Sequence, residues 1–347
     1  MSRCLQKLAE GEWKSEVTAK LGRIRFLTSV RALGGTENSA LSSERHLVLT
    51  VAFFGSGGQG SMIPLGAISK RHRVIALVRP AKSRSGFGRV IRSVLSRSGI
   101  GERAVMSKWA NMHDAPLLDA VSGRDPAIVR HLKTLAPDVI CVSAFPWLLS
   151  AEILSIARCS AFNVHASLLP RHRGPNPLLW IYYRNDRRTG VTVHRMNRQA
   201  DAGEILAQQA FDLPRGFPVE QLYSRKALLG GELLLRVLDD AEAGNLKPVS
   251  QDEHLSTHAP RVAHGVGMVD FGEWDVERVW HFLSGLCSRR REPLQDDRKQ
   301  QVRYRSVLGY TPGDCNGEAG EVRSAPFGWN LYCRDGSIQL GDGRTPL

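Results

Sequence analysis

The stretch LVLTVAFFGSGGQGSMIPLGAISKRHRVIALV, residues 47–78, sets the fold class of this 347-residue chain. Its first part, Leu47–Phe54, is apolar and rich in β-branched and aromatic side chains, which is typical of a buried strand. A glycine-rich turn follows, Ser61–Ser69 has a helical pattern, and Val74–Val78 predicts a second buried strand. A strand–helix–strand unit of this kind joins parallel strands. The sequence therefore predicts an α/β fold with a doubly wound, mostly parallel sheet.

The turn after the first strand, GSGGQG at Gly55–Gly60, matches the dinucleotide pattern G-x-G-x-x-G. That pattern also needs an acidic residue about 20 residues further on, to hold a ribose hydroxyl. The second strand ends instead at Arg79, which would suit the 2′-phosphate of NADP. Two interpretations stay open here: a tight turn in any doubly wound sheet, or an NADP-dependent oxidoreductase.

Further elements alternate along the chain as a doubly wound sheet requires. Helices are predicted at Val90–Leu95, Pro126–Leu135, Ala151–Arg158, Pro177–Arg184, Pro218–Leu238 and within Asp270–Leu286, and strands at Pro137–Ser143, Ala161–Val164, Gly190–Met196 and Ile205–Gln209. Beyond these, short strand-like runs are separated by glycine and proline: Val302–Leu308, Gly320–Val322, Trp329–Cys333 and Ser337–Leu340. They predict a small all-β domain of the barrel type.

The predicted domain organisation follows from these patterns. We expect a poorly ordered N-terminal extension at 1–46, a catalytic domain at 47–243, a linker at 244–260 and an OB-like barrel at 261–347. The extension has no secretory signal, and its glutamates count against an organellar transit peptide despite its arginines. Six cysteines without a CxxC pair predict reduced thiols. Together these features favour a cytoplasmic protein.

The net charge of +13 is distributed unevenly along the chain. The segment Arg79–Lys108 is strongly basic and contains one acidic residue, Glu102. Excess positive charge attracts polyanions such as nucleic acid or phosphates. A solvated, arginine-rich surface without a partner is the alternative interpretation.

A polar cluster lies in FNVHASLLPRHRG, residues 162–174. On a strand, Asn163, His165 and Ser167 point to the same face because side chains alternate. With Asp201 of the turn DAGE, residues 201–204, they provide an amide, an imidazole and a carboxylate. This set suits acyl transfer to an amine and suits metal binding poorly. We expect Ser167 to hold the loop by a backbone hydrogen bond.

Two other histidines lie near this cluster in the sequence. His172 stands between two arginines after a turn, which favours a surface position. His194 falls on the alternation of Gly190–Met196, which favours a structural role.

The motifs FNVHASLLPRHRG, TGVTVHRM and ADAGEILAQ, in this order, resemble the 10-formyltetrahydrofolate-dependent formyltransferases, including the methionyl-tRNA and amino-sugar members. The resemblance extends from about Leu47 to the C-terminus. It implies a catalytic triad of Asn163, His165 and Asp201, 10-formyltetrahydrofolate as formyl donor, and no metal. It also implies that the glycine run faces the acceptor and holds no dinucleotide.

Binding residues are implied by the same resemblance. For the formyl donor they are Phe145, Pro146, Trp147, Leu148, Ala202 and Gly203. For the acceptor they are Gly55, Ser56, Arg173, Gly174 and Asn176.

The acceptor has two interpretations. Methionyl-tRNA is favoured by the C-terminal domain and by Arg79–Lys108, where the tRNA enzymes have a basic insertion. A nucleotide-linked amino sugar, or another small amine, is favoured by Asn176-Pro177 and Trp180, since the tRNA enzymes usually have small residues there. A formate-releasing hydrolase is a variant, because the same triad can direct water.

Overall fold

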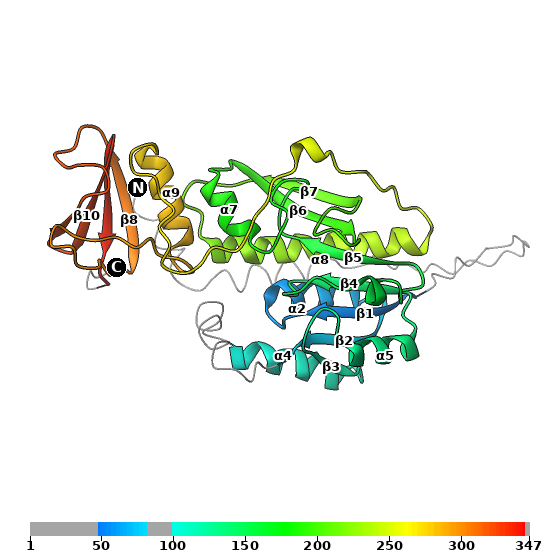
Figure 1. Ribbon diagram of the computed structural model, residues 1–347. Coiled ribbons are helices and arrows are strands. Elements are labelled where there is room, and N and C mark those ends of the chain that lie inside the picture. Colours follow the sequence, from blue (N-terminus) through cyan, green and yellow to red (C-terminus); the bar gives the residue numbers. More distant parts are fainter. Residues whose placement is uncertain (1–47, 82–98, 344–347) are drawn as a thin grey trace, which may run out of the picture. The chain divides into compact units, whose positions relative to one another are not determined.

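The computed structural model describes residues 48–81 and 99–343. In this part of the chain, seven strands form a mixed sheet (Figure 1). Their order is β3 (Leu117–Ala120), β2 (Arg73–Pro80), β1 (Thr50–Gly55), β4 (Val139–Ser143), β5 (Ser160–His165), β6 (Arg188–Arg195) and β7 (Ile205–Asp212). The strands from β3 to β5 pair in parallel, and β6 and β7 are added antiparallel. The predicted α/β class and mostly parallel sheet are confirmed.

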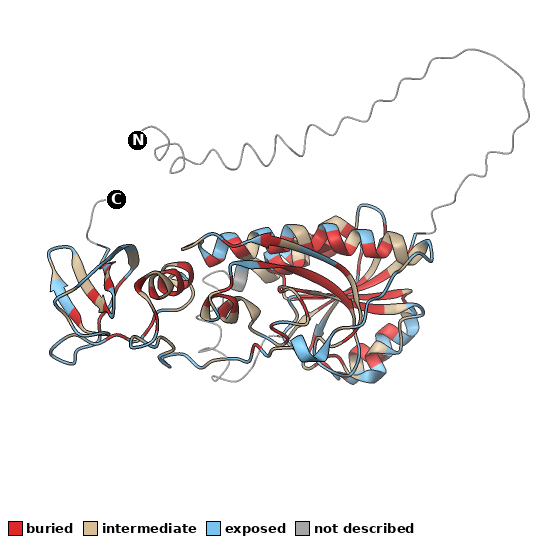
Figure 2. Cartoon of the chain, turned by 90° about the horizontal axis from the view of Figure 1, so that it is seen from above, coloured by how far each residue is buried: buried red, intermediate tan, exposed pale blue. Residues whose placement is uncertain are grey.

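Apolar side chains cover both faces of this sheet, as a doubly wound fold requires. Along β1, Val51 and Phe53 enter one core, with residues of α2 (Gln59–Ile68), α4 (Gly99–Met112) and α8 (Val219–Glu242). Ala52 and Phe54 enter the opposite core, with residues of α5 (Pro126–Leu135) and α6 (Ala151–Leu154). Figure 2 shows the resulting run of buried residues along the central strands.

Most elements lie where the sequence predicts them, and the exceptions have local causes. The bounds of α5 are as predicted; Asp125 caps it by accepting the Ala127 N–H. Helix α6 ends early, because Arg158 and Cys159 donate backbone hydrogen bonds to residues 137 and 138 as the chain turns towards β5. Strand β3 and helix α4 were not predicted. The predicted helix Val90–Leu95 lies outside the described residues.

The expected all-β part is an antiparallel sheet in the order β8 (Ser306–Pro312), β11 (Gly336–Gly341), β10 (Gly328–Cys333) and β9 (Val322–Ala325). In this order β8 and β9 are the edges, so the described residues form an open sheet, and closure into a barrel is not seen among them. The sheet shares a hydrophobic core with α7 (Pro177–Tyr183) and α9 (Val276–Leu286). Within the described ranges, no helix is both long and apolar enough to span a membrane.

The described residues belong to one compact unit, His46–Leu347. The predicted linker 244–260 is not a free tether within it. Val249 forms an antiparallel bridge with Ile205 at the start of β7, and His258 forms a parallel bridge with Arg173. The short 3-10 helix η1 (Glu253–Leu255) lies between these two bridges. This segment therefore runs along the loops that flank the polar cluster. The predicted extension 1–46 lies outside the described residues.

Candidate active site

Strands β5 and β6 present the first part of the polar cluster. Asn163 and His165 lie two residues apart on β5, so they occupy the same face, as predicted. The antiparallel register places Asn163 directly opposite His194 of β6. The Asn163 Nδ2 group donates to Nε2 of His194 at 3.1 Å, and the other nitrogen of His194 lies 2.9 Å from the carbonyl oxygen of Arg195. His194 is thus part of the cluster.

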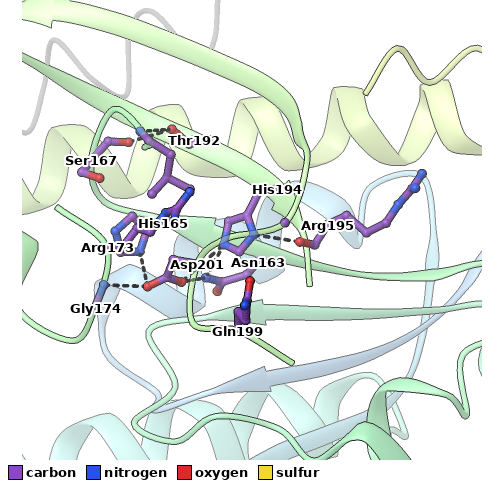
Figure 3. A network of polar contacts seen from close by, with 12 residues as sticks. Asn163, His165, Ser167, Arg173, Gly174, Thr192, His194, Arg195, Gln199 and Asp201 are labelled. Carbon is purple, nitrogen blue, oxygen red and sulfur yellow. Dashed lines mark hydrogen bonds and ion pairs between the residues drawn. The ribbon is translucent and has the colours of Figure 1, made fainter. Parts of the chain in front are cut away.

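The turn between β6 and β7 supplies Asp201, whose side chain completes the cluster (Figure 3). Its Oδ1 atom accepts from Asn163 Nδ2 at 3.3 Å and lies 3.4 Å from His194 Nε2. Its Oδ2 atom accepts the Gly174 N–H at 2.8 Å and lies 3.6 Å from Nδ1 of His165. The structure therefore brings Asn163, His165 and Asp201 together.

The charge of Asp201 is stabilised by its neighbours. Burial alone would raise the pKa of this carboxyl group, but His165, His194 and the Gly174 N–H together hold that pKa well below its usual range. Asp201 therefore remains ionised throughout the physiological pH range. Its backbone is in the left-handed region, with φ 53°, a conformation that costs a non-glycine residue about 1–2 kcal/mol.

His165 is buried, and its two ring nitrogens have different partners. The Nε2 group donates to the carbonyl oxygen of His172 at 2.9 Å, which fixes the neutral tautomer with its lone pair on Nδ1. That lone pair faces Asp201. Burial lowers the pKa of His165, and the charge of Asp201 partly opposes this shift. At neutral pH the imidazole is thus a proton acceptor beside a carboxylate that stabilises its charged form.

His172 is buried, so its predicted surface position is wrong. Its Nε2 atom lies 2.6 Å from Asp186, a buried carboxylate that also accepts from Arg171. The backbone N–H of His172 donates to the Thr257 hydroxyl, and its φ of 59° turns its carbonyl oxygen towards His165. Local sequence favoured the surface because the buried partner, Asp186, lies 14 residues further along the chain, beyond the end of α7.

Ser167 supports the loop, as predicted. Its hydroxyl group donates to the carbonyl oxygen of Arg171 at 2.7 Å and is completely buried. Thr192 of β6 donates to the Ser167 carbonyl oxygen and accepts the Leu169 N–H on the same loop. These bonds fix the loop that begins after β5.

Residues 145–148, which were predicted to bind the formyl donor, form an apolar ledge after β4. The ring of Phe145 packs edge-on against that of Phe54, with ring centroids 5.3 Å apart, and against that of Trp147, with centroids 5.5 Å apart. Phe145 and Trp147 are half-buried, and Pro146 and Leu148 are exposed. In α/β proteins with a parallel sheet, ligands bind at the carboxyl ends of the strands, and aromatic side chains are common in their binding sites.

The other residues predicted for the donor, Ala202 and Gly203, follow Asp201 in its turn. A Cβ atom on Gly203 would overlap the Arg195 carbonyl oxygen, so glycine is needed there. This contact keeps the turn close to the end of β6.

The residues of the glycine run are engaged within the protein. The backbone N–H groups of Ser56 and Gly57 both donate to Oγ of Ser61, and the Gly60 N–H donates to the Tyr223 hydroxyl. These donors are therefore not directed at a pyrophosphate. Gly55, predicted with Ser56 to face the acceptor, ends β1.

Arg79, which the NADP interpretation assigned to a 2′-phosphate, is also paired. Its guanidinium donates to Asp119 at 2.8 Å and to Ser107 at 2.7 Å, and Arg103 donates to the same Asp119 carboxylate. The arginine that the NADP interpretation needs is therefore already bound within the protein, and so are two of the arginines in the segment Arg79–Lys108 that was predicted to bind tRNA.

The predicted acceptor residues after β5 contact the 244–260 segment. Arg173 is buried and donates to Gln251 and to the exposed carboxylate of Glu253, which balances its charge. The Asn176 N–H donates to the Ala259 carbonyl oxygen. Gly174 lies in the left-handed region, with φ 115°, and binds Asp201 as described above.

The described part of the chain contains no group of three or more histidine, cysteine, aspartate or glutamate residues arranged to hold a metal ion. The site offers an amide, a neutral imidazole and an ionised carboxylate at the carboxyl ends of parallel strands. This fold and this set of groups suit an α/β enzyme that acts at a carbonyl carbon.

Comparison with known proteins identifies the family. Residues 52–238 match the formyl transferase family. The chain is 34% identical over 239 residues to methionyl-tRNA formyltransferase of Anaeromyxobacter dehalogenans, covering 69% of this chain and 73% of that protein. It is 34% identical over 247 residues to the protein of the same name from Geobacter sulfurreducens, covering 70% and 76%. The chain belongs to the formyl transferase family, and the activity it shares with that family is the transfer of a formyl group.

Solved structures share the fold. The N-formyltransferase from Helicobacter canadensis, in complex with folinic acid and dTDP-3-aminofucose, has a TM-score of 0.61 at 13% identity, covering 85% of this chain and 99% of that one. HypX from Aquifex aeolicus in complex with tetrahydrofolic acid has a TM-score of 0.54 at 18% identity; the likeness covers 84% of this chain and 43% of HypX.

Proposed function

We propose that this protein transfers a formyl group from 10-formyltetrahydrofolate to the amine of methionyl-tRNA. Family membership and the relatives named methionyl-tRNA formyltransferase support this choice of acceptor. The observation that supports the chemistry best is the contact of Asp201 with both Asn163 and His165.

The ledge after β4 and the Asp201 turn fit the donor. Phe145 and Trp147 offer half-buried aromatic faces, and Gly203 allows the turn to lie close to β6. When bound there, 10-formyltetrahydrofolate supplies a formyl carbon attached to a nitrogen leaving group. We assign donor binding to Phe145–Leu148 with Ala202 and Gly203.

The catalytic roles follow from the contacts. As the acceptor amine attacks the formyl carbon, its oxygen gains negative charge, which an N–H of Asn163 stabilises after leaving its long 3.3 Å contact with Asp201. Nδ1 of His165 takes the proton that the amine loses, and Asp201 stabilises the imidazolium. The same proton then passes to the departing nitrogen as its bond to the formyl carbon breaks. His165 therefore starts the cycle neutral.

The rest of the chain has proposed roles too. We assign catalysis to 47–243 and acceptor recognition to Gly55, Ser56, Asn176 and the basic segment, with support from 261–347. Arg173 and Gly174 act by holding Asp201 and its surroundings. We place the enzyme in the cytoplasm, where its acceptor would be made.

A small amine is the second candidate acceptor. It is favoured by the fold shared with the N-formyltransferase solved with dTDP-3-aminofucose, which extends over 99% of that chain. Trp180, one residue that suggested this candidate, donates to the Pro260 carbonyl oxygen and so has a structural partner.

One assay separates the candidates. Purified protein is incubated with 10-formyltetrahydrofolate and either charged initiator methionyl-tRNA or a panel of nucleotide-linked amino sugars, and the formylated product and free formate are measured. We expect formylated methionyl-tRNA and little free formate. If only an amino sugar were formylated, the acceptor would be that amino sugar and not methionyl-tRNA. Formate release without any amine would identify a hydrolase, and no turnover of the donor in any mixture would refute the proposed function.

A further inference from the structure

The turn that bears Asp201 is held by a side chain from outside the matched family region. Gln251 lies in the 244–260 segment, beyond residues 52–238. Its Nε2 group donates to the backbone carbonyl oxygen of Asp201 at 2.8 Å and to that of Gly203 at 2.6 Å. Both hydrogens of this amide are therefore used on one turn.

The oxygen of the same amide binds the second loop of the site. Oε1 of Gln251 accepts from Nε and from a terminal nitrogen of Arg173, at 3.0 and 2.8 Å. The next residue, Gly174, donates its N–H to the Asp201 carboxylate. Gln251, Arg173, Gly174 and Asp201 thus form a closed ring of contacts between two loops.

The backbone of the segment reinforces this ring. Thr257 accepts the Arg173 N–H on its carbonyl oxygen and the His172 N–H on its hydroxyl group, and the Ala259 N–H donates back to Arg173. His172 in turn accepts the Nε2–H of His165. The segment therefore contacts the residues that orient both the imidazole and the carboxylate.

A left-handed aspartate needs such support. The φ of Asp201 is 53°, and a non-glycine residue keeps this conformation only where its surroundings fix it. The Nε2 group of Gln251 binds the carbonyl oxygens on both sides of residue 202, so it restrains the turn in which Asp201 sits.

We propose that Gln251 is a positioning residue for formyl transfer, which holds the Asp201 carboxylate beside Asn163 and His165. This inference rests on the proposed function, because Asp201 is assumed to act in catalysis. It gives the 244–260 segment a role in the reaction, where the sequence predicted a linker.

The test compares Gln251→Ala and the nearly isosteric Gln251→Glu with Gln221→Ala, a matched control on an exposed position of α8. Misplacing a catalytic group by about 1 Å can lower turnover about 100-fold. We expect both Gln251 variants to lower kcat about 10- to 100-fold, with the KM of the formyl donor changed less than about twofold. The control keeps wild-type kinetics. If Gln251→Ala does not fold, the kinetics of Gln251→Glu test the proposal.

A second readout separates positioning from general support. The charged and titratable groups that face His165 are Asp201 in the turn, His194 on β6 and Lys226 on α8. Of these, only Asp201 favours the imidazolium. If Gln251 holds Asp201 in place, removing it lets His165 titrate at a lower pH, measured by NMR of isotope-labelled histidine. A double variant with Asp201→Asn should lose no more kcat than Asp201→Asn alone.

Three outcomes would overturn the inference: unchanged kcat in both variants, an unmoved titration of His165, or additive losses in the double variant. A wild-type protein that formylates no acceptor would refute the proposed function instead. The NMR titration does not depend on activity, so it still tests the role of Gln251 in that case.

Discussion

Asp201 and His165 show how burial and charge act together on one pair of side chains. Burial favours the neutral imidazole, whereas the nearby carboxylate favours the charged form. In the proposed reaction, His165 is therefore a base that is neutral when the amine attacks and is stabilised once it has taken the proton. The contact of 3.6 Å leaves the two groups close without a direct hydrogen bond in the neutral state.

Asp201→Asn tests this pair, because the amide keeps the shape of the side chain and removes its charge. We expect kcat to fall about 10²–10⁴-fold, the range for losing acid–base assistance. The acidic limb of the kcat profile should move to lower pH, since the charge of Asp201 no longer opposes the lowering of the His165 pKa by burial. Rates measured from about pH 5 to about pH 9 would show both effects. Asp212→Asn, exposed at the end of β7, is the control; wild-type rates in Asp201→Asn would exclude a catalytic role for this carboxylate.

His281 offers a test of stability at the level of one residue. It is completely buried on α9, and its Nδ1 atom accepts the Gly216 N–H. Burial, with help from Arg215 and Arg187, lowers the pKa of His281 to about 3. The folded state therefore binds fewer protons than the unfolded state between about pH 6.5 and about pH 3, so stability is lost as pH falls through this window.

When the pH is lowered from about 6.5 to about 5, the free energy of unfolding measured in urea should fall by about 1.5 kcal/mol more for the wild-type protein than for His281→Gln. The glutamine oxygen can still accept the Gly216 N–H, so the variant tests the charge. Equal losses in both proteins would show that His281 does not account for the acid sensitivity.

At the scale of elements, the turn between β6 and β7 is shaped by close backbone contact. Asp201 and Gly203 lie in it, and the Glu204 carbonyl oxygen accepts the Arg195 N–H at its base. The turn can bring its carboxylate to β5 only if residue 203 has no side chain.

Gly203→Ala should therefore disturb the site from the backbone. The new Cβ atom would overlap the Arg195 carbonyl oxygen, so the turn must shift. We expect a loss of kcat of at least about tenfold and a loss of stability of about 1–3 kcal/mol. A Cβ atom on Gly66 in α2 would have nothing within 4 Å, so Gly66→Ala should keep activity and gain about 0.5–1 kcal/mol of stability. Steady-state kinetics and urea unfolding of the pair measure this; an unaffected Gly203→Ala would contradict the tight turn.

At the scale of the whole molecule, charge should distinguish the acceptors. The net charge is +13, but several arginines are paired internally, including Arg79, Arg103 and Arg173. We therefore expect a tRNA to bind mainly through other basic residues. Such binding releases counterions from the nucleic acid and so weakens with salt.

We expect the KM for methionyl-tRNA to rise at least about tenfold between about 50 and about 200 mM salt. The KM for 10-formyltetrahydrofolate in the same assays is the internal control and should change much less. A flat salt dependence for the tRNA would argue against an extended phosphate contact and would favour a small amine acceptor.

Local patterns were sufficient for much of this protein. Alternating and apolar runs predicted the central strands, and the spacing of Asn163 and His165 placed them on one face, because strand geometry depends on neighbouring residues only. These local patterns did not predict α4. Its glycines weaken the helical signal, although Met106 and Ala110 are buried one turn apart.

Long-range contacts required the tertiary structure. Four contacts join residues from different elements. Asp201 approaches β5, His194 pairs with Asn163, His172 is buried against Asp186, and Gln251 binds the Asp201 turn. Each depends on strand register or chain path, which local preferences do not encode. The sequence alone therefore establishes the types of the candidate catalytic groups, whereas their protonation and orientation are set by packing in the tertiary structure.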